Sequence, residues 1–348
     1  MYYSKITGAG MYVPEEVVTN DALSKLMNTS DEWIIERTGI RERRFFKEGV
    51  DTVASMGVKA AAQAMERAGK KPEEIDMIVM ATLSADYNFP GSGVLVQRSL
   101  PFRQIPAFDV RAQCSGFIYA LSVADQFIKT GMYQNILVIG SEKHSFGLDF
   151  TTRGRNVSVI FGDGAGAVVL QRSNNNTSEI LSTHLHSNGN DAETLAMYNP
   201  GTHANYWKKD LADFNEASLG DMFMSHSMID NAQNFPFMDG PAVFKKAVVK
   251  MPEVIMEALQ ANNYTTQDID MLISHQANLR IIQFIQHTLK LNDDKVYNNI
   301  QQYGNTTAAS VPIALCEAWE KGKIKEGDLV CLTVFGSGFT WASALLKW

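Results

Sequence analysis

The chain has 348 residues, 45% hydrophobic and 20% charged, which is enough to bury a large core and to form two domains or one two-part fold. Its formal net charge of −7 argues against general nucleic-acid binding, because neutralising phosphates needs a basic surface. With no signal peptide and no uninterrupted apolar run of about 18 residues, the sequence predicts a cytoplasmic protein and argues against a membrane span.

Apolar runs rich in β-branched residues alternate with helical patterns along the chain. In order, the patterns predict a helix at 53–68, a strand at 75–83, a helix at 115–129, strands at 136–140 and 166–170, a helix at 252–261, and strands at 271–274 and 329–335. The helix at 115–129 is apolar on nearly every side, which predicts that it is buried in the middle of a domain. The alternation indicates an α/β architecture with sheets covered by helices.

Two parts of the chain repeat each other weakly at one constant offset of 194 residues. The segment IDMIV at 75–79 matches IDMLI at 269–273, and Ala120-Leu121 falls on Ala314-Leu315. The repeat predicts a duplicated α/β unit with an N-terminal half at 1–174 and a C-terminal half at 175–348. Residues 188–236, which hold several Asn, Asp and aromatic residues, are expected to be an insertion in the second half; we call them the excursion.

The three cysteines, Cys114, Cys316 and Cys331, form neither a CxxC motif nor an even framework, as is usual in a reducing compartment. Cys114 lies where a predicted strand ends and the apolar helix begins. The positive end of a helix dipole and its unpaired N–H groups favour a thiolate, so Cys114 is the candidate nucleophile. Cys316 and Cys331 lie inside a helix and a strand and are interpreted as small buried hydrophobic residues.

His275, alone among the seven histidines, directly follows a predicted buried strand. The carboxyl end of such a strand faces the ligand crevice in α/β folds. His184 and His186 alternate in a segment expected to be an exposed strand and are interpreted as surface residues. No pair of histidines has metal-ligand spacing with carboxylate or cysteine partners, so no metal site is expected. Asn305 opens another helix after Gly304, where either a helix cap or a functional amide fits.

Two glycine-rich loops follow or precede strands. The loop FGDGAG at 161–166 leads into a strand and not a helix, which argues against a dinucleotide site. The loop FGSGF at 335–339 follows a strand, and its small residues would let backbone N–H groups approach a ligand closely.

Taken together, the motifs resemble those of the β-ketoacyl-(acyl-carrier-protein) synthase III family. In family order they are TSDEWI at 29–34, RTGI at 37–40, CSGF at 114–117, HQAN at 275–278, GNTTAAS at 304–310 and GFTW at 338–341. The resemblance runs along the whole chain. It implies a thiolase-like, duplicated five-layer αβαβα fold and a homodimer.

The resemblance also implies a two-stage reaction that starts the synthesis of fatty acids or related chains. Cys114 would take an acyl group from an acyl-CoA as a thioester, with the backbone N–H groups of Cys114 and Ser337 as the oxyanion hole. His275 and Asn305 would then hold the malonyl thioester of an acyl-carrier protein and stabilise the enolate formed on loss of CO2. The coenzyme A thioester is a substrate, and no cofactor is expected.

Further positions are implied to bind the substrates. They are Trp33, Arg37, Arg155, Phe89, Asn278, Gly240 and Phe335. Trp33 and Arg155 would sandwich the adenine of coenzyme A with Arg37 nearby, Asn278 would order water and position His275, and Phe89 would reach the acyl pocket of the partner subunit. Carrier protein, which is acidic, is expected to dock on a local basic patch. That patch comprises Lys245, Lys246, Lys250 and Arg280.

Three features depart from the family pattern and leave the primer open. Pro241 replaces a residue that bonds the pantetheine arm, and Gln113 is bulkier than the usual residue before the cysteine. The excursion is rich in methionine and aromatic side chains, which suit the wall of an acyl pocket. Packing on the dimer partner or filling the core of the second half would explain the same composition.

Other enzyme classes fit the motifs less well. A thiolase would need a second cysteine where Ser337 stands, and a chain-elongating synthase a second histidine at Asn305. The Trp33 region and GNTTAAS argue against a type III polyketide synthase, and the duplicated α/β pattern against a papain-like hydrolase. Two alternatives stay open, namely an enzyme of secondary metabolism that uses a non-acetyl primer and a non-catalytic partner subunit of a condensing heterodimer.

Overall fold

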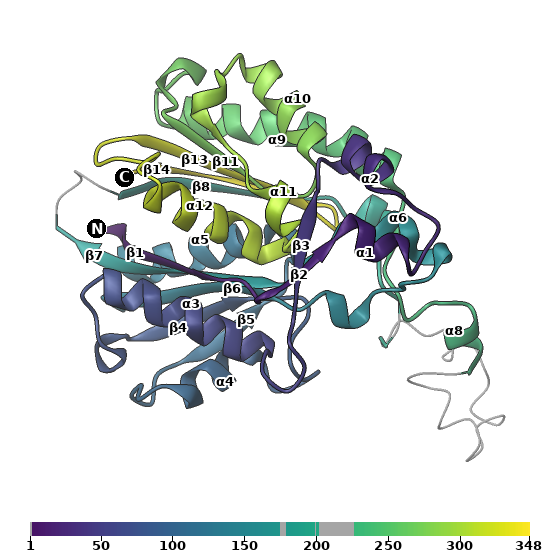
Figure 1. Cartoon of the computed structure of the whole chain (residues 1–348). Helices are drawn as coiled ribbons and strands as arrows, with labels where there is room; N and C mark the ends of the chain where they lie inside the picture. Colours follow the sequence, from purple (N-terminus) through teal and green to yellow (C-terminus); the bar gives the residue numbers. More distant parts are fainter. Residues whose placement is uncertain (1, 175–178, 199, 202–225) are drawn as a thin grey trace, which may run out of the picture.

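The computed structural model describes residues 2–174, 179–198, 200–201 and 226–348. It contains two five-stranded sheets stacked with helices between and outside them (Figure 1). Among the described residues, none of the helices has both the length and the apolar character needed to cross a membrane.

The first sheet has the strand order β1-β7-β6-β4-β5, and the second has the order β8-β14-β13-β11-β12. The strands of the first are β1 Tyr3–Tyr12, β4 Met77–Ala81, β5 Ala107–Val110, β6 Asn135–Glu142 and β7 Gly164–Ser173. Those of the second are β8 Glu179–Ser187, β11 Met271–Ser274, β12 Val296–Tyr297, β13 Leu329–Gly336 and β14 Thr340–Lys347. In each sheet three strands run parallel and two pair antiparallel at one end.

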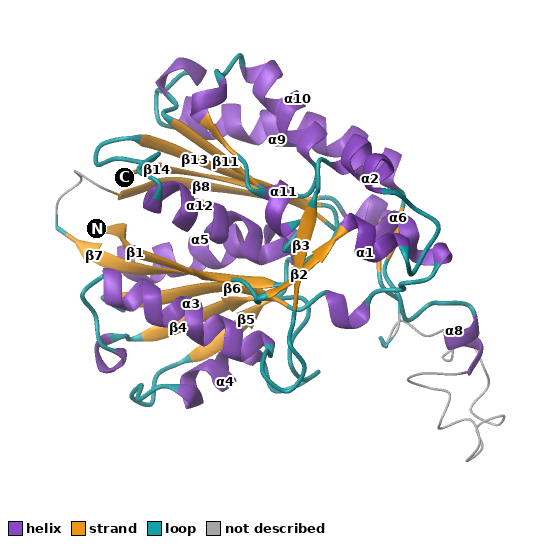
Figure 2. Cartoon of the chain, viewed as in Figure 1, coloured by secondary structure: helices purple, strands orange, loops and turns teal. Residues whose placement is uncertain are grey.

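Helices form the remaining three layers (Figures 1 and 2). Helices α3 (Val53–Arg67) and α4 (Ser92–Ser99) cover the outer face of the first sheet. Helices α5 (Gly116–Lys129) and α12 (Ser310–Glu320) lie between the sheets, and α9 (Gly240–Ala261) with α10 (Leu279–Leu289) covers the second sheet. The predicted five-layer thiolase-like fold is therefore confirmed.

Shorter elements complete the chain. The helices are α1 Asn20–Ser24, α2 Asp31–Thr38, α6 Arg155–Ser158, α8 His226–Asp230 and α11 Ile300–Tyr303. Two-stranded pairs are formed by β2 Glu16–Thr19 with β3 Glu42–Phe45, and by β9 Leu195–Ala196 with β10 Phe237–Met238. Two short 3-10 helices matter for the site, η2 Gln113–Ser115 and η10 Thr307–Ala309.

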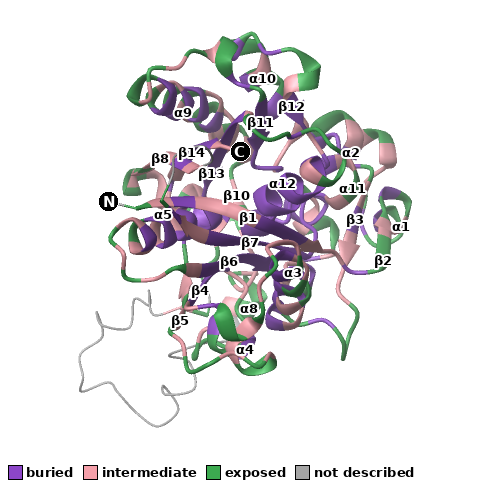
Figure 3. Cartoon of the chain, turned by 90° about the vertical axis from the view of Figure 1, so that its left-hand side faces the viewer, coloured by how far each residue is buried: buried purple, intermediate pink, exposed green. Residues whose placement is uncertain are grey.

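The core explains why α5 is apolar on nearly all sides. Phe117, Ile118 and Leu121 are fully buried in the cluster that joins both sheets through the middle layer. Figure 3 shows the same layer as buried ribbon within a more exposed outer shell. Because both faces of α5 meet a sheet, a one-sided amphipathic pattern would leave polar groups without water.

The 194-residue offset is visible element by element. The elements η2 and η10 begin at Gln113 and Thr307, β4 and β11 at Met77 and Met271, and β6 and β13 at Asn135 and Leu329. Each pair is separated by the same 194 residues, so the weak sequence match marks a true structural duplication.

One helix boundary was wrong. The sequence predicts a helix at 252–261. The structure instead has α9 starting at Gly240 and running through Pro252. Packing on β13 and β14 holds the helix across the proline, so tertiary contacts override the local signal.

Candidate active site

Cys114 lies in the tight turn that links β5 to α5. The turn η2 precedes α5 directly, so Cys114 lies at the start of the buried helix as predicted. Gln113 has φ of 45°, in the left-handed region that a non-glycine residue rarely adopts. Thr307, its counterpart 194 residues later, also has φ of 45°. Both halves of the duplication therefore place a strained turn at the base of a central helix.

His275 follows β11 directly and is 3% exposed. Its Nδ1 lies 2.7 Å from Oγ of Ser310, the first residue of α12. The Ser310 oxygen also accepts a weak bond from the Gln276 N–H, at 3.4 Å. Where the Ser310 hydroxyl donates to Nδ1, the proton of the neutral imidazole is on Nε2, which is then a donor for a substrate oxygen.

Asn305 is 5% exposed, and its Oδ1 accepts a 2.8 Å bond from the Thr307 N–H. The backbone on either side is tied down as well, since Asn305 N–H donates to Ile160 and its carbonyl accepts from Gly162. With Oδ1 engaged, the amide Nδ2 remains as the group that can donate to a ligand. The side chain is fixed by its own turn and does not serve as the cap of α12.

The turn η10 brings the three predicted catalytic residues together. It packs against η2, which carries Cys114. Thr307 of this turn forms a hydrogen bond with Asn305, and Ser310, directly after the turn, forms one with His275. From the other side, a Cβ added to Gly336 would come 2.8 Å from the Cβ of Cys114. The loop after β13, with Ser337, therefore lies against the cysteine, and a small residue at 336 is required there.

Cys114 and His275 are both uncharged in this site. Burial, followed by the Glu142 carboxylate, raises the pKa of the Cys114 thiol to about 12. Burial lowers the pKa of His275 to about 3. The thiolate that the helix terminus alone would favour is therefore not preformed, because loss of hydration outweighs the helix dipole. Neutral His275 suits a hydrogen-bond donor better than a cation would, because no charge has to be buried.

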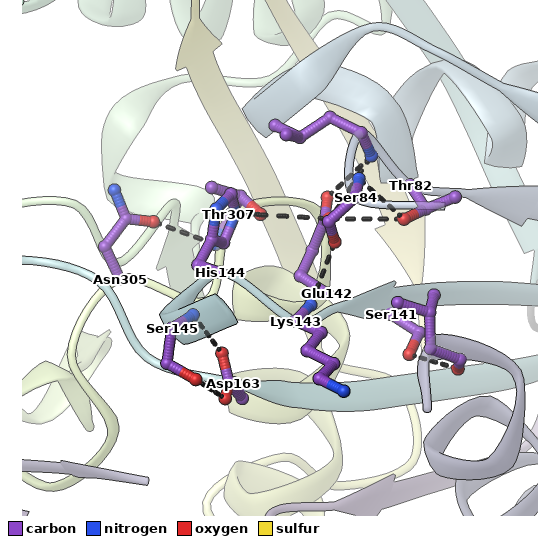
Figure 4. A network of polar contacts seen from close by, with 12 residues as sticks. Thr82, Ser84, Ser141, Glu142, Lys143, His144, Ser145, Asp163, Asn305 and Thr307 are labelled. Atoms are coloured by element: carbon purple, nitrogen blue, oxygen red, sulfur yellow. Dashed lines mark hydrogen bonds and ion pairs between the residues drawn. The ribbon is translucent and has the colours of Figure 1, made fainter. Parts of the chain in front are cut away.

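A buried polar network beside Cys114 was not predicted from the sequence. Glu142 is fully buried at the end of β6 and accepts bonds from the Thr82 and Ser84 hydroxyls at 3.2 and 2.5 Å. His144 Nε2 lies 2.8 Å from Oγ1 of Thr307. Figure 4 shows Glu142 between Thr82 and Ser84 on one side and His144 and Thr307 on the other. The network thus continues to the turn that holds Asn305.

The reason for missing His144 is a strand end placed two residues short. The predicted strand stopped at residue 140, whereas β6 runs to Glu142. His144 is thus two residues beyond a buried strand, whereas His275 follows its strand directly, as predicted. The same carboxyl-end rule, applied with the true boundary, would have identified it.

The predicted coenzyme A residues form an arginine–tryptophan cluster near α2 and α6. The guanidinium carbons of Arg37 and Arg155 lie 4.5 and 4.7 Å from the centre of the Trp33 ring. Asn278 caps α10 and donates 2.9 Å to the Arg37 carbonyl, which ties α10 to α2. Two cations on one aromatic ring make a surface that can accept a planar, phosphate-bearing group.

Other predicted residues lie in different surroundings. Phe89 is 86% exposed, while Phe335 is buried in the core and packs on Phe339 at 4.9 Å between ring centres. Gly240 begins α9. In the basic patch, Lys246 pairs with Asp191 at 2.8 Å and Lys250 with Glu253 at 2.6 Å, whereas Lys245 and Arg280 are exposed. Two of the four cations are thus partly neutralised.

His184 and His186 lie in the strand β8 at the surface, as interpreted, with side chains 15% and 39% exposed. Both side chains bond the Glu257 carboxylate, at 3.1 and 2.6 Å. They share one face of β8, and α9 covers that face. Within the described residues, no group of three or more His, Cys, Asp or Glu is arranged to hold a metal ion.

A cavity of about 940 Å³ has Cys114 in its wall. Leu195, Ala196, Met197 and Pro236, from the two described ends of the excursion, form part of the same wall. The hydroxyl of Ser337 donates to the Leu195 carbonyl, which anchors the start of the excursion beside the site. Tyr206, Trp207, Met222, Phe223 and Met224, which were expected to shape the pocket, lie outside the described residues.

Comparisons with known proteins identify the family. Residues 108–189 match the family model "3-Oxoacyl-[acyl-carrier-protein (ACP)] synthase III", and residues 259–348 match the model of its C-terminal part. A β-ketoacyl-[acyl-carrier-protein] synthase III from Caldanaerobacter subterraneus subsp. tengcongensis is 44% identical over 99% of this chain and 97% of its own length.

Solved structures are similar along the full chain. The 3-oxoacyl-[acyl-carrier-protein] synthase III of Aquifex aeolicus is 42% identical with a TM-score of 0.86, covering 99% of this chain and 100% of that one. The synthase III of Thermus thermophilus is 35% identical with a TM-score of 0.87, covering 99% of each chain.

Proposed function

Because the chain belongs to the 3-oxoacyl-[acyl-carrier-protein] synthase III family of acyl-transferring condensing enzymes, we propose that it moves an acyl group from acyl-CoA to Cys114 and condenses it with malonyl-carrier protein. The observation that carries the assignment of residues is the convergence of Cys114, His275 and Asn305 around the turn η10. The product is a β-ketoacyl-carrier protein.

In the first stage the sulfur of Cys114 attacks the thioester carbonyl carbon of acyl-CoA. The thiol proton leaves the cysteine, and coenzyme A departs as its thiol, so that one thioester replaces another. Backbone N–H groups of Cys114 and Ser337 stabilise the oxyanion, since the loop carrying Ser337 lies against the cysteine. Because the thiol pKa is about 12, loss of the proton is coupled to the attack.

In the second stage the malonyl thioester loses CO2, and the electrons of the broken C–C bond form an enolate. Nε2–H of His275 and Nδ2–H of Asn305 donate to the thioester oxygen, where the charge develops. The enolate carbon then attacks the acyl carbonyl on Cys114, and the cysteine leaves as a thiolate that regains a proton. Both donors are neutral and held in place before the substrate arrives.

Two surfaces are proposed for the substrates. The Trp33–Arg37–Arg155 cluster holds the adenine and phosphates of coenzyme A, as its paired cation–π contacts allow. Carrier protein docks on the predicted basic patch, where Lys245 and Arg280 offer exposed charge. The ends of the excursion wall the acyl cavity, which supports the proposal that it shapes primer choice.

A reconstituted reaction tests the proposal. Wild-type protein incubated with acyl-CoA and malonyl-carrier protein should yield β-ketoacyl-carrier protein, detected by mass spectrometry of the carrier. The Cys114→Ser variant should yield none while keeping the wild-type circular dichroism. A non-catalytic partner subunit would yield no product with either protein, and that result would reject the proposal.

A further inference from the structure

The wall of the cavity at Cys114 contains an imidazole, which distinguishes it from a purely apolar acyl pocket. His144 and Phe161 both line the cavity, and their ring centres are 4.7 Å apart. The His144 side chain is 10% exposed. Phe161 and Leu148 supply apolar surface in the same wall. Polar side chains such as Ser84 and Lys143 also line the cavity, so a ligand there meets both apolar and polar surface.

The hydrogen bonds around His144 engage one of its two ring nitrogens. Nε2 lies 2.8 Å from Oγ1 of Thr307, and either atom can be the donor. Nδ1 has no hydrogen-bond partner among the residues that the structure describes. A hydroxyl on a ligand can pair with Nδ1 in either tautomer, because a hydroxyl both donates and accepts.

The charge of the ring is settled by its burial. Burial lowers the pKa of His144 to about 4, so the ring is neutral at pH 7. A neutral ring nitrogen favours a ligand group that is itself neutral and can donate or accept a hydrogen bond, as a hydroxyl can, because an unpaired buried polar atom costs free energy. A carboxylate on the ligand would meet Glu142, whose Oε2 is 4.0 Å from His144 Nε2, and an ammonium would lose its hydration.

We propose that the cavity accepts a primer acyl chain carrying a hydroxyl group, which forms a hydrogen bond with Nδ1 of His144. The inference rests on the proposed function, since it names the class of acyl group that Cys114 receives. His144 is then a specificity-determining residue that takes no part in the bond changes at the thioester.

The test compares acyl-CoAs that differ only in hydroxyl against methyl. Two such pairs are 3-hydroxybutyryl-CoA with isovaleryl-CoA, and 2-hydroxypropionyl-CoA with isobutyryl-CoA. Within each pair the acyl groups have nearly the same shape, so size cannot explain a preference. The rate of covalent labelling of Cys114 is followed by intact-protein mass spectrometry. Wild-type protein should label at least about tenfold faster with the hydroxyl member of one pair.

Variants separate His144 from the rest of the site. His144→Leu should lose the hydroxyl preference and keep labelling with the methyl member, while His144→Gln, which retains an acceptor, should recover part of the preference. His287→Leu, an exposed histidine in the last turn of α10, is the matched control and should behave as wild type.

The outcomes distinguish the two proposals. Wild-type protein that labels at equal rates within both pairs, or prefers the methyl member in both, overturns the inference and leaves the proposed function intact. An unchanged hydroxyl preference in His144→Leu also overturns it. If no acyl-CoA of any kind labels Cys114, the proposed function itself fails.

Discussion

The thiol of Cys114 is held in its protonated form by its surroundings. Burial is the larger cause of its raised pKa, and the Glu142 carboxylate adds to it. The start of α5 works in the opposite direction, because a helix N-terminus stabilises a thiolate. The balance favours the thiol, so the free enzyme should be less reactive toward simple electrophiles than a cysteine with a preformed thiolate.

The reactivity of this cysteine should therefore rise with pH throughout the accessible range. Below the pKa of about 12 the thiolate fraction grows about tenfold per pH unit, so carbamidomethylation of Cys114 by iodoacetamide should climb from pH 7 to 10 without a plateau. Burial raises the pKa of Glu142 itself to about 7, so Glu142→Gln removes a negative charge above that pH and should lower the pKa of Cys114, which speeds labelling between about pH 8 and 10. The rates are measured on the Cys114 peptide by mass spectrometry.

Glu16→Gln, on the exposed strand β2, serves as the control for the Glu142 variant and should label at the wild-type rate. A plateau below pH 8 in the wild-type protein would show a preformed thiolate and contradict this account.

His275 and Asn305 should act in the second stage more than in the first. His275→Ala and Asn305→Ala each remove one donor to the enolate oxygen, so decarboxylation of malonyl-carrier protein should fall by about 10²–10³-fold. Acylation of Cys114 should stay within about tenfold of wild type, as followed by release of coenzyme A. If acylation is lost to the same extent in His275→Ala, the histidine serves chiefly as the base for the thiol.

Among the elements, the close approach of β7 to the central helix α12 sets a limit on residue size. A Cβ added to Gly166 would lie 2.7 Å from the Ile313 nitrogen and from the Pro312 carbonyl carbon. Backbone on both sides cannot yield easily, so Gly166→Ala should lower the free energy of unfolding by about 1–3 kcal/mol. The measurement is thermal or denaturant unfolding.

Gly189→Ala is the matched control, because an added Cβ there meets nothing within 4 Å. Equal stability of the two variants would show that β7 and α12 can separate without cost.

The sequence predicted the elements near the site better than their ends. The buried helix at Cys114 follows from its unusual apolar pattern, and β11 was predicted with both of its boundaries. The end of β6 was set two residues early, which hid Glu142 and His144. No local signal marks such an end, because the last residues of β6, Ser141 and Glu142, are polar and are held in the strand by pairing with β7.

At the scale of the whole molecule, the duplication explains how three distant residues form one site. Equivalent turns of the two halves, η2 and η10, pack against each other, which brings residues 114 and 305 together across 190 positions of sequence. The motifs predicted which residues would meet. They could not show that Ser310 holds His275, because hydrogen bonds between distant segments leave no pattern in one sequence.

The homodimer stays a prediction. The strand β5 is an edge of the first sheet, and Phe89, which precedes α4 in the chain, is 86% exposed. If Phe89 enters the acyl cavity of the partner, Phe89→Ala should widen that cavity and improve labelling by longer acyl-CoAs about tenfold, while sedimentation still shows a dimer. Met132→Ala, also at an exposed apolar residue, is the control.

A dimer in which Phe89→Ala leaves chain-length preference unchanged would contradict this placement of Phe89. A wild-type protein that sediments as a monomer would contradict the homodimer itself.

The most direct test of the central claim is intact-protein mass spectrometry after incubation with a panel of acyl-CoAs, followed by peptide mapping. We expect one acyl adduct per chain, located on Cys114, with Cys316 and Cys331 unmodified. The mass of the adduct identifies the primer. An adduct on Cys316 or Cys331, or a full adduct on the Cys114→Ser variant, would contradict this expectation.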